Sequence, residues 1–457
     1  MRTAALTSFG ERFDGEIVMP GSADYDATRI VWNGMIDRRP AVIARCTTDE
    51  DVRAAILFAR DQDLVAAVRC GGHSVGGFST CDDGIVIDLS TMHGVEVDPE
   101  ARVARVRGGS LLQELDAAAQ EHGLACPVGV VGHTGVGGLT LGGGMGRLQR
   151  HWGFSIDNML AVDLLTADGE RLRASEDENP DLFWGMRGAG ANFGVVTSFE
   201  FRLHELGTIV TQGTMLFPAE RAHQVAARVR EWSPYAPDEV MTSYGFGQAT
   251  SEPPHPPDQE GRPMLSMAVT HSGSPVAAEE DLRPLRELGP VVDTIEPRRY
   301  LDVQAMADED MAWGRRFYMK GGFLAELSDG FVHAGLESVA AAPGPGGTIT
   351  LWLQGGAIAR SDPGSMAFTG REALFWLGVE CEWSGEDLDD AYVGWGRSTM
   401  AALEPFTTAG HYVNDLVESD ESIVRSIYGD AKYERLLALK RTYDPDNVFR
   451  LNQNIRP

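Results

Sequence analysis

Basic side chains are scarce in this sequence. Its 39 lysine and arginine residues stand against 67 aspartate and glutamate residues, which gives a formal net charge of −28. Nucleic acids and anionic membrane surfaces are bound by basic patches, so this balance argues against both classes of partner. The sequence also lacks an apolar run of about 18 residues, so no segment is expected to span a membrane. Its first residues lack the cationic start and apolar middle of a signal peptide, and we expect a cytoplasmic protein.

Cysteine is sparse as well. The five cysteines are odd in number and irregularly spaced, and no Cys-x-x-Cys pair occurs. Disulfide scaffolds and structural zinc sites both depend on regular cysteine patterns. We therefore expect free thiols, as in a reducing compartment, and no metal site.

Two common nucleotide-binding motifs are missing. A Walker loop requires a Gly-Lys pair, and none occurs in the sequence. A Rossmann fingerprint places its glycines between a strand and a helix. The glycines of GAGANFG (188–194) instead precede VVTSFEF, which has the composition of a strand. These absences argue against a P-loop and against NAD binding.

Hydrophobic periodicity divides the chain into two parts. At 457 residues the chain is too long for one ordinary core, so two or three domains are expected. The first part alternates predicted strands and helices, with strands at 40–46, 64–70, 84–90 and in a hairpin at 159–175, and helices at 47–62 and 110–123. From about residue 206 glycine becomes rarer, and longer strands are predicted at 241–247, 264–273, 348–356 and 373–383.

The C-terminal segment has a pattern of its own. A helix that includes residues 428–443 is predicted to stop near Asp444, because Pro445 cannot continue it. The apolar residues Phe449, Leu451 and Ile455 alternate with polar ones, which predicts a docked strand in the tail.

Glycine, by contrast, is abundant in three segments. They are RCGGHSVGG (69–77), the long block 125–158 and GAGANFG (188–194). The glycine density of block 125–158 predicts an irregular functional loop without a helix or sheet, because fixing each glycine costs backbone entropy. Clustered backbone N–H groups can bind a pyrophosphate without basic side chains. We therefore expect a dinucleotide ligand, held by a fold other than the Rossmann fold.

Five motifs occur in a fixed order along the chain: RCGGHS, TGVGGLTLGGGMG, SIDN, GANFGVVTSFEF and YDPDNVFRLNQNI. From about residue 25 to residue 457, the chain resembles the FAD-linked oxidases of the vanillyl-alcohol-oxidase/p-cresol-methylhydroxylase (PCMH) class, in the branch related to berberine bridge enzyme. The resemblance implies an α+β fold with a two-part, PCMH-type FAD-binding domain, made of residues 1–205 and a C-terminal segment 426–457. It places a substrate-binding domain of antiparallel sheet flanked by helices, residues 206–425, between the two parts.

The resemblance also implies that FAD is bound covalently, through a bond between His73 and the 8α-methyl carbon of the flavin. Such a bond requires a neutral imidazole as the nucleophile, and the small residues around His73 permit a close approach. The other residues that the resemblance places at the cofactor are Arg69, Gly71, Gly72, Ser74, Gly77, Val131, Thr134, Gly135, Gly138, Leu139, Gly142, Gly144, Asn158, Gly194, Val196, Tyr412, Asn452 and Asn454.

Some members of this family carry a second bond, from a cysteine to the flavin. In those members the cysteine lies four residues before Gly-Val-Gly-Gly, a position that Val131 occupies here. Cys126 lies five residues too early, so we expect a single link, through His73. A shifted loop would keep a link to Cys126 open.

For the reaction, the resemblance implies hydride transfer to flavin N5 from a carbon that bears OH or NH, with reoxidation by O2. The partners are then a small organic substrate and O2, while a dehydrogenase with another electron acceptor and a non-catalytic flavin-binding protein stay open as alternatives. Relatives often use a carboxylate on the strand at 348–356 as base, and this strand has none. The catalytic candidates are Tyr412, Tyr244, Gln354, Tyr318 and Lys320, and the substrate-contact candidates are Tyr244, Trp352, Gln354 and Asn414.

Overall fold

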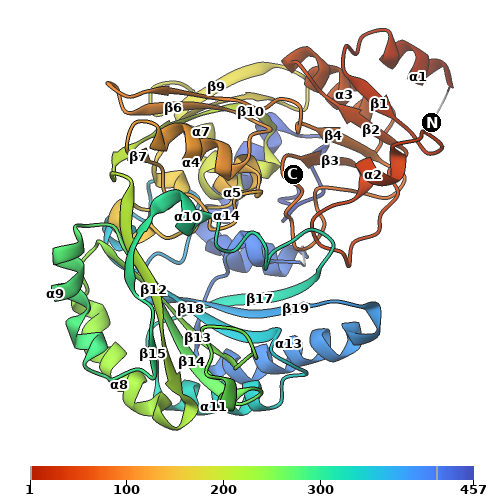
Figure 1. Cartoon of the computed structure of the whole chain (residues 1–457). Helices are drawn as coiled ribbons and strands as arrows, with labels where there is room; N and C mark the ends of the chain where they lie inside the picture. Colours follow the sequence, from red (N-terminus) through yellow and green to blue (C-terminus); the bar gives the residue numbers. More distant parts are fainter. Residues whose placement is uncertain (1–2, 418–419) are drawn as a thin grey trace.

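The computed structural model describes residues 3–417 and 420–457. Figure 1 shows two layered bodies, one built mainly from the first half of the chain and one centred on a broad sheet whose outer side is covered by helices. The chain enters the second body near β12 and returns to the first through α14. No helix among the described residues is long and apolar enough to cross a membrane.

The first body contains a small, mostly parallel sheet. Its strands, in spatial order, are β1 (Glu16–Val18), β2 (Val42–Arg45), β4 (Ile85–Asp88) and β3 (Ala66–Arg69). Strands β2, β4 and β3 are parallel, and β1 is antiparallel to β2. Helix α3 (Asp49–Asp61) connects β2 to β3, and a reciprocal capping box between Thr48 and Asp51 fixes its start. Its apolar side packs on β2 and β4, so the sheet is buried beneath it.

A second, antiparallel sheet completes the first body. Its strands, in spatial order, are β5 (Val95–Asp98), β6 (Val103–Arg107), β10 (Val195–Arg202), β8 (Met159–Leu165) and β9 (Arg171–Ser175). Helices α4 (Leu112–Gln120), α7 (Pro180–Ala189) and α14 (Glu421–Tyr443) share one hydrophobic core with this sheet. Helix α14 is interrupted at Gly429, whose φ of 69° is non-helical. A short ladder joins β7 (Leu124–Ala125) to β11 (His204–Glu205).

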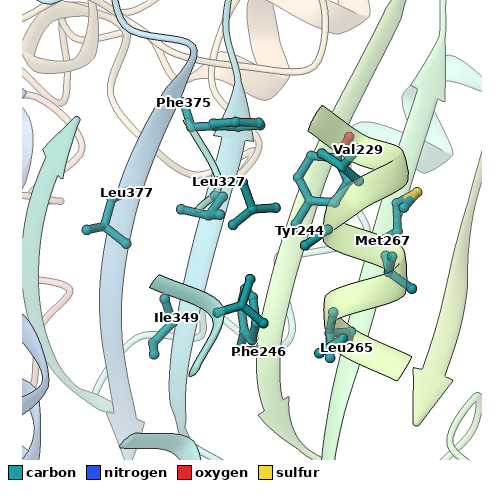
Figure 2. Close-up of a cluster of buried hydrophobic side chains, with 14 of the residues drawn as sticks. Val229, Tyr244, Phe246, Leu265, Met267, Leu327, Ile349, Phe375 and Leu377 are labelled. Atoms are coloured by element: carbon teal, nitrogen blue, oxygen red, sulfur yellow. The ribbon is translucent and has the colours of Figure 1, made fainter. Parts of the chain in front are cut away.

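The second body is a large antiparallel sheet. Its strands, in spatial order, are β15 (Val292–Asp293), β12 (Ile209–Pro218), β14 (Pro263–His271), β13 (Val240–Gln248), β18 (Gly347–Leu353), β19 (Phe375–Trp383), β17 (Arg316–Leu324) and β20 (Thr407–Thr408), and β16 (Glu296–Arg299) also pairs with β12. One face is covered by α8 (Ala222–Trp232), α9 (Pro275–Arg286), α11 (Asp329–Ala340) and α13 (Asp389–Leu403). Side chains on this face form the core cluster of Figure 2. The opposite face turns toward the first body (Figure 1).

Shorter helices lie in the connections. They are α1 (Thr3–Gly10), α2 (Tyr25–Arg29), α5 (Val136–Leu141), α6 (Gln149–Trp152), α10 (Tyr300–Gln304) and α12 (Ala357–Arg360). Helices α5 and α6 fall inside the glycine-rich block, so the prediction of a wholly irregular segment at 125–158 was wrong. Val136 and Thr140 of α5 are buried, and packing of these side chains offsets the entropy that its glycines lose.

The tail after α14 is docked, but not as the predicted strand. Phe449 and Ile455 are buried, and no strand is assigned among residues 444–457. The tail is held instead by Lys440 and Asp444, both fully buried. The Lys440 ammonium lies 2.7 Å from an Asp444 carboxylate oxygen and donates to the carbonyl of Phe449, while the Asp444 carboxylate accepts from the backbone N–H groups of Val448 and Phe449. This buried ion pair fixes the start of the tail, and hydrogen bonds of Asn192 with Gln453 and Ile455 hold its end.

The arrangement confirms the predicted α+β class, with an antiparallel sheet and helices in the second body. The predicted domain limits at 205/206 and 425/426 stay a prediction. The second of them falls inside α14, which begins at Glu421 and packs with α7 of the first body.

Candidate active site

A cavity opens in the first body between the two sheets and the C-terminal tail. Its lining comes from β3 and β10, from α5 and from segments around residues 70–74, 413–414 and 449–453. The three glycine-rich segments of the sequence therefore meet at one place. No lysine or arginine lies among the described residues that line it, so an anionic ligand there is bound by backbone N–H groups and polar side chains.

Two of these segments touch backbone to backbone. A Cβ atom added at Gly71 would lie 2.3 Å from the Gly135 nitrogen, and one added at Gly135 would lie 2.4 Å from the Gly71 nitrogen. Real side chains do not tolerate such distances, so glycine is required at both positions. At Gly138, by contrast, a Cβ would meet nothing within 4 Å and would project into open space at the cavity.

His73 lies on the cavity wall between two rings. Trp32 stacks on its imidazole with ring centroids 4.7 Å apart, and the Nδ1 atom of His133 lies 2.7 Å from its Nε2 atom. The hydroxyl of Thr134 lies 3.3 Å from the other ring nitrogen, Nδ1. Burial lowers the pKa of His73 to about 3, with the neighbouring His133 adding to the effect. His73 is therefore neutral at physiological pH, as a nucleophilic imidazole must be.

The cavity contains polar atoms that suit a large polar ligand. Within the described part of the chain, Ser79 Oγ and Asn452 Oδ1 line the cavity, are buried and have no hydrogen-bond partner. Buried polar atoms are normally hydrogen-bonded. Together with the open space at Gly138 and the neutral His73, these atoms fit a dinucleotide that carries an apolar ring system at one end.

The uncovered face of the large sheet continues from this cavity. Phe317 of β17 stacks on Trp32, which in turn stacks on His73. Met319 lies two residues after Phe317 on β17, and it pairs with Glu380 of β19. Strand alternation therefore places Met319 and Glu380 on the same face of the sheet as Phe317. Glu380 thus lies on the sheet face that runs onward from the His73 end of the cavity.

Asp415 approaches the same face from the other end of the cavity. It follows Val413 and Asn414, which line the cavity, and it packs so closely on β17 that a Cβ at Gly321 would lie 2.5 Å from its Oδ2 atom. Trp376 Nε1 donates to that oxygen at 2.6 Å. The sheet face therefore carries two carboxyl groups, from Glu380 and Asp415, beside an indole.

Both carboxyl groups hold protons more tightly than usual. Burial raises the pKa of Glu380, although the Thr350 hydroxyl donates to its carboxylate at 2.6 Å. Burial raises the pKa of Asp415 well above its ordinary range, with the charge of Glu380 adding to the effect and the Trp376 hydrogen bond opposing it. Two carboxyls in unlike environments can divide acid and base roles. Here the Trp376 indole occupies Asp415, which favours Glu380 as the proton acceptor.

Comparison with known proteins identifies the family. Residues 40–175 match the FAD binding domain family, and residues 391–456 match the berberine and berberine-like family. The chain is 34% identical to (R)-6-hydroxynicotine oxidase of Paenarthrobacter nicotinovorans, over 97% of each chain. The chain belongs to the berberine-bridge-enzyme-like FAD-linked oxidoreductases. This confirms the family that the five motifs predict.

Other relatives agree with this assignment. An FAD-linked oxidoreductase of Dictyostelium discoideum is 29% identical over all of this chain and 97% of its own length. The crystal structure of 6-hydroxy-D-nicotine oxidase from Arthrobacter nicotinovorans superposes with a TM-score of 0.87 at 32% identity, covering 97% of this chain and 98% of that one. A berberine-bridge-like protein of Physcomitrella patens, at 22% identity over 98% of each chain, has the same fold with a TM-score of 0.87. The predicted two-domain PCMH-type architecture is thereby confirmed, and the chain is an FAD-dependent oxidoreductase.

Many residues predicted at the cofactor of this oxidoreductase do meet at the cavity. Those that line it are Gly71, Gly72, His73, Ser74, Thr134, Gly135, Gly138, Leu139, Gly194, Val196 and Asn452, joined by Asn414, which was predicted to contact substrate. Their roles toward FAD stay predictions. They converge because the glycine-rich segments pack backbone to backbone, as at Gly71 and Gly135.

Other predicted cofactor residues do not line the cavity. Arg69 is turned away and pairs with the buried Asp88 at 2.6 Å. Asn158 is occupied by the carbonyls of Trp152 and Phe154, to which its amide donates. These two side chains brace the fold, and their contact with the cofactor stays a prediction. The remaining predicted residues outside the lining are Gly77, Val131, Gly142, Gly144, Tyr412 and Asn454.

Some of these outer residues support the cavity from behind. A Cβ at Gly142 would lie 2.0 Å from the side-chain oxygen of Asn414, so this glycine gives the amide its room. The N–H of Gly144 donates to the Tyr412 hydroxyl at 3.0 Å. Gly77 has a φ of 74° and forms a turn. These glycines support the cavity wall through their backbone.

Tyr412 is held as a positioning residue rather than as a base. Its hydroxyl oxygen accepts from Gly144 N–H and from the Asn414 amide at 2.9 Å. The Asn414 amide also donates to the carbonyl of Leu139 on the cavity wall. Burial raises the pKa of Tyr412 above its ordinary value, so the phenol keeps its proton. A catalytic role of Tyr412 stays a prediction, and these contacts favour positioning over proton transfer.

Three further catalytic candidates point to the wrong side of the sheet. Tyr244 lies in the core between β13 and α8, beside Val229 and Phe375 (Figure 2), and its hydroxyl accepts from Thr242. Tyr318 is on the same helix-covered face, where its hydroxyl accepts from Arg397. Lys320 follows Tyr318 by two residues on β17, so strand alternation gives it that face as well. The structure brings none of the three to the cavity.

Of the substrate candidates at 348–356, Trp352 lies on β18 and Gln354 follows directly after the strand. Trp352 packs edge-to-face on Trp376 with ring centroids 6.0 Å apart. Gln354 follows it by two residues and is fully buried, and both polar atoms of its side chain are without a hydrogen-bond partner within the described ranges. Trp352 thus contributes to an aromatic wall, and Gln354 has unused hydrogen-bonding capacity nearby.

Five residues of the site were not predicted from the sequence: Glu380, Asp415, Trp376, Trp32 and His133. A signal for Glu380 was present, because the predicted strand 373–383 has Trp376 and Glu380 on one face by alternation. Glu380 lies on β19, the neighbour of the strand on which relatives carry a carboxylate. No local signal marks Trp32, which reaches His73 across a gap of some 40 residues in the chain.

Replacing Gly138 by valine is expected to reduce the fraction of purified protein that carries flavin. The new branched side chain would project into the cavity, and overpacking of about 1–3 kcal/mol corresponds to roughly tenfold or more in binding. The flavin-to-protein absorbance ratio measures the effect. Gly394→Val is the matched control, since a Cβ there also meets nothing within 4 Å but lies on the exposed side of α13. Equal flavin content in both variants would contradict the assignment of the cavity.

Proposed function

We propose that this oxidoreductase oxidises a small organic molecule by taking a hydride from a carbon that bears OH or NH and passing it to N5 of FAD. Dioxygen then accepts the electrons. The observation that carries the proposal is the pairing of a neutral His73 in the cavity with a sheet face that presents Glu380 onward from it. FAD supplies the redox chemistry when bound, and the protein supplies orientation and a proton acceptor.

The cofactor is proposed to be linked covalently through His73 alone. Cys126 is fully buried in the core of the second sheet, it does not line the cavity, and burial raises the pKa of its thiol well above the ordinary value. A protonated thiol in a core is a poor nucleophile. Val131, which occupies the position of the second link in doubly linked relatives, carries no reactive group. Both observations support a single link.

The substrate is proposed to lie between the cavity and the uncovered face of the large sheet. Trp352 and Trp376 form an apolar wall there, and the Glu380 carboxylate is positioned to accept the proton of the substrate's OH or NH group. Asp415 holds the Trp376 indole in place through its hydrogen bond. Asn414 and Tyr412 fix the cavity end nearest to this face. We propose the same two-domain limits as above, 1–205 with 426–457 and 206–425, and a cytoplasmic location.

Acid precipitation of the purified protein tests the link. We expect the yellow colour to stay in the pellet, and peptide mass analysis to find flavin on the His73 peptide alone. The variant His73→Ala should release its flavin into the supernatant. Flavin that bridges His73 and Cys126 would contradict the single link, and flavin released from the wild type would contradict covalent attachment.

Anaerobic mixing with a panel of alcohols, amines and sugars tests the reaction. We expect at least one compound to bleach the flavin absorbance, and oxygen consumption to follow when air is admitted. Bleaching without oxygen consumption would indicate a dehydrogenase that uses another acceptor. A flavin that no organic compound reduces would contradict the catalytic proposal.

A further inference from the structure

The imidazole of His133 is the closest titratable partner of His73. Its Nδ1 atom lies 2.7 Å from His73 Nε2, a hydrogen-bond distance that requires one ring to donate and the other to accept. The two rings are tilted by 43°, with centroids 4.7 Å apart. The contact is therefore edge to edge through nitrogen atoms, not a stack.

The surroundings of His133 fix which ring donates. Its other nitrogen, Nε2, lies 3.4 Å from the backbone carbonyl of Asp308, which can only accept. His133 therefore carries its hydrogen on Nε2 and presents a lone pair at Nδ1. The hydrogen between the two rings then belongs to His73 Nε2.

This arrangement leaves His73 Nδ1 with the free lone pair. Nδ1 is the ring nitrogen nearest to the Thr134 hydroxyl, which lines the cavity. The nitrogen placed to attack a ligand is thus unprotonated, and the opposite nitrogen carries the proton that must leave after attack. The Nδ1 atom of His133 lies 2.7 Å from that opposite nitrogen and can accept its proton.

A covalent bond from His73 to the flavin has a fixed balance of atoms and electrons. A C–N bond forms between His73 and the 8α carbon, while one C–H bond of that methyl group and the N–H bond of His73 break. The ring system takes up two electrons and the methyl proton, and the N–H proton goes to a base. Dioxygen then takes the two electrons, and with these two protons it leaves as hydrogen peroxide. As the imidazole forms its new bond, it becomes more acidic at Nε2, and a base there speeds the step.

We propose that His133 accepts the Nε2 proton of His73 as the bond to the flavin forms, and so drives covalent attachment. The inference rests on the proposed link through His73. Asp308 holds the segment that carries His133, because its backbone carbonyl lies 3.4 Å from His133 Nε2 and its carboxylate accepts from the Gly132 N–H at 2.6 Å. Trp32 holds the His73 ring from its face, and the Trp32 indole is anchored by donation to the carbonyl of Met311.

The experiment follows covalent incorporation into apoprotein. Full-length wild-type protein, His133→Asn and His133→Ala are prepared from riboflavin-starved cells and mixed with FAD in air. Samples are precipitated with acid at intervals, and the flavin in each pellet is measured. Asparagine at 133 can still accept a hydrogen bond but cannot take a proton, so it separates positioning from proton transfer.

We expect both variants to bind FAD reversibly and to incorporate it about 100-fold more slowly or worse, the usual effect of losing a general base. Added imidazole should accelerate His133→Ala, whose space is empty, and leave wild type unchanged. The matched control is His151→Asn, because His151 also hydrogen-bonds through Nδ1, but to the Ser272 hydroxyl rather than to His73. It should incorporate flavin at the wild-type rate.

Two results would overturn the inference alone. They are incorporation at the wild-type rate in both variants, and slow incorporation in His133→Ala that imidazole does not rescue, which would give His133 a structural role. Wild-type protein that never retains flavin in acid would overturn the covalent link itself, and the inference with it. The failure of the proposed link is thus distinguishable from the failure of the role of His133.

Discussion

Glu380→Gln is expected to lower kcat by about 100-fold or more, within the range for loss of a general base. Glutamine keeps the size of the side chain and can still accept from the Thr350 hydroxyl, but it cannot take a proton. The measurement is the rate of anaerobic flavin bleaching by a compound that reduces the wild-type enzyme. Flavin content should be unchanged, since Glu380 does not line the cofactor cavity.

The pH profile separates a proton acceptor from a structural residue. Glu380 must be deprotonated to act, and burial raises its pKa, so wild-type kcat/KM should fall as the pH decreases through a midpoint above the ordinary glutamate value of about 4.3. Glu380→Gln should lose this acidic limb.

A control lies two residues away on the same face of β19. Glu382 is paired with Arg315, so Glu382→Gln is expected to keep both kcat and the acidic limb. A Glu380→Gln enzyme with a wild-type profile would contradict the assignment of the base.

Lys440→Met is expected to destabilise the protein by about 3–5 kcal/mol, because removing one partner of a buried ion pair leaves the other charge uncompensated. Lys440 and Asp444 are both fully buried, 2.7 Å apart, and Lys440 also donates to the carbonyls of Asn192 and Phe449. The loss should free the tail that carries Asn452. Urea unfolding of the flavin-free protein, with flavin content of the purified variant, measures both effects.

Arg450→Met tests whether any charge removed from the tail would do the same. Arg450 pairs with Asp63 at 3.4 Å, and the Asp63 side chain is 93% exposed. Exposed ion pairs contribute about 0–1 kcal/mol, so this variant should unfold near the wild-type midpoint. Equal destabilisation of the two variants would show that the buried pair has no special role.

The elements of the first body were largely predictable because their signals are local. Strands β2 and β4 coincide with apolar runs, and α3 begins at a threonine with an acidic residue three positions on. The failures were non-local. Helix α5 forms in spite of its glycines because tertiary packing compensates, and the tail docks through Lys440 and Asp444 rather than by strand pairing.

The site residues also differ in whether their signals are local. The motifs predicted that His73 and the glycines lie at one site, because these residues belong to short segments with local signals. The substrate side depends on which face each strand presents and on which strands are neighbours. Tyr244 and Glu380 both lie on strands that were predicted. The Tyr244 side chain lies on the sheet face that helices cover, and the Glu380 side chain lies on the opposite face. No local sequence pattern distinguishes these two faces.

One wall of the cavity is made by residues 449–453, while another is made by residues 66–74. Domains fold as units during synthesis, with N-terminal parts first, and here the N-terminal part lacks a wall until nearly the whole chain has been translated. The cofactor chamber is therefore assembled last. We therefore expect flavin to load after translation, because nascent chains that stop short of the tail lack the lining residues 449–453.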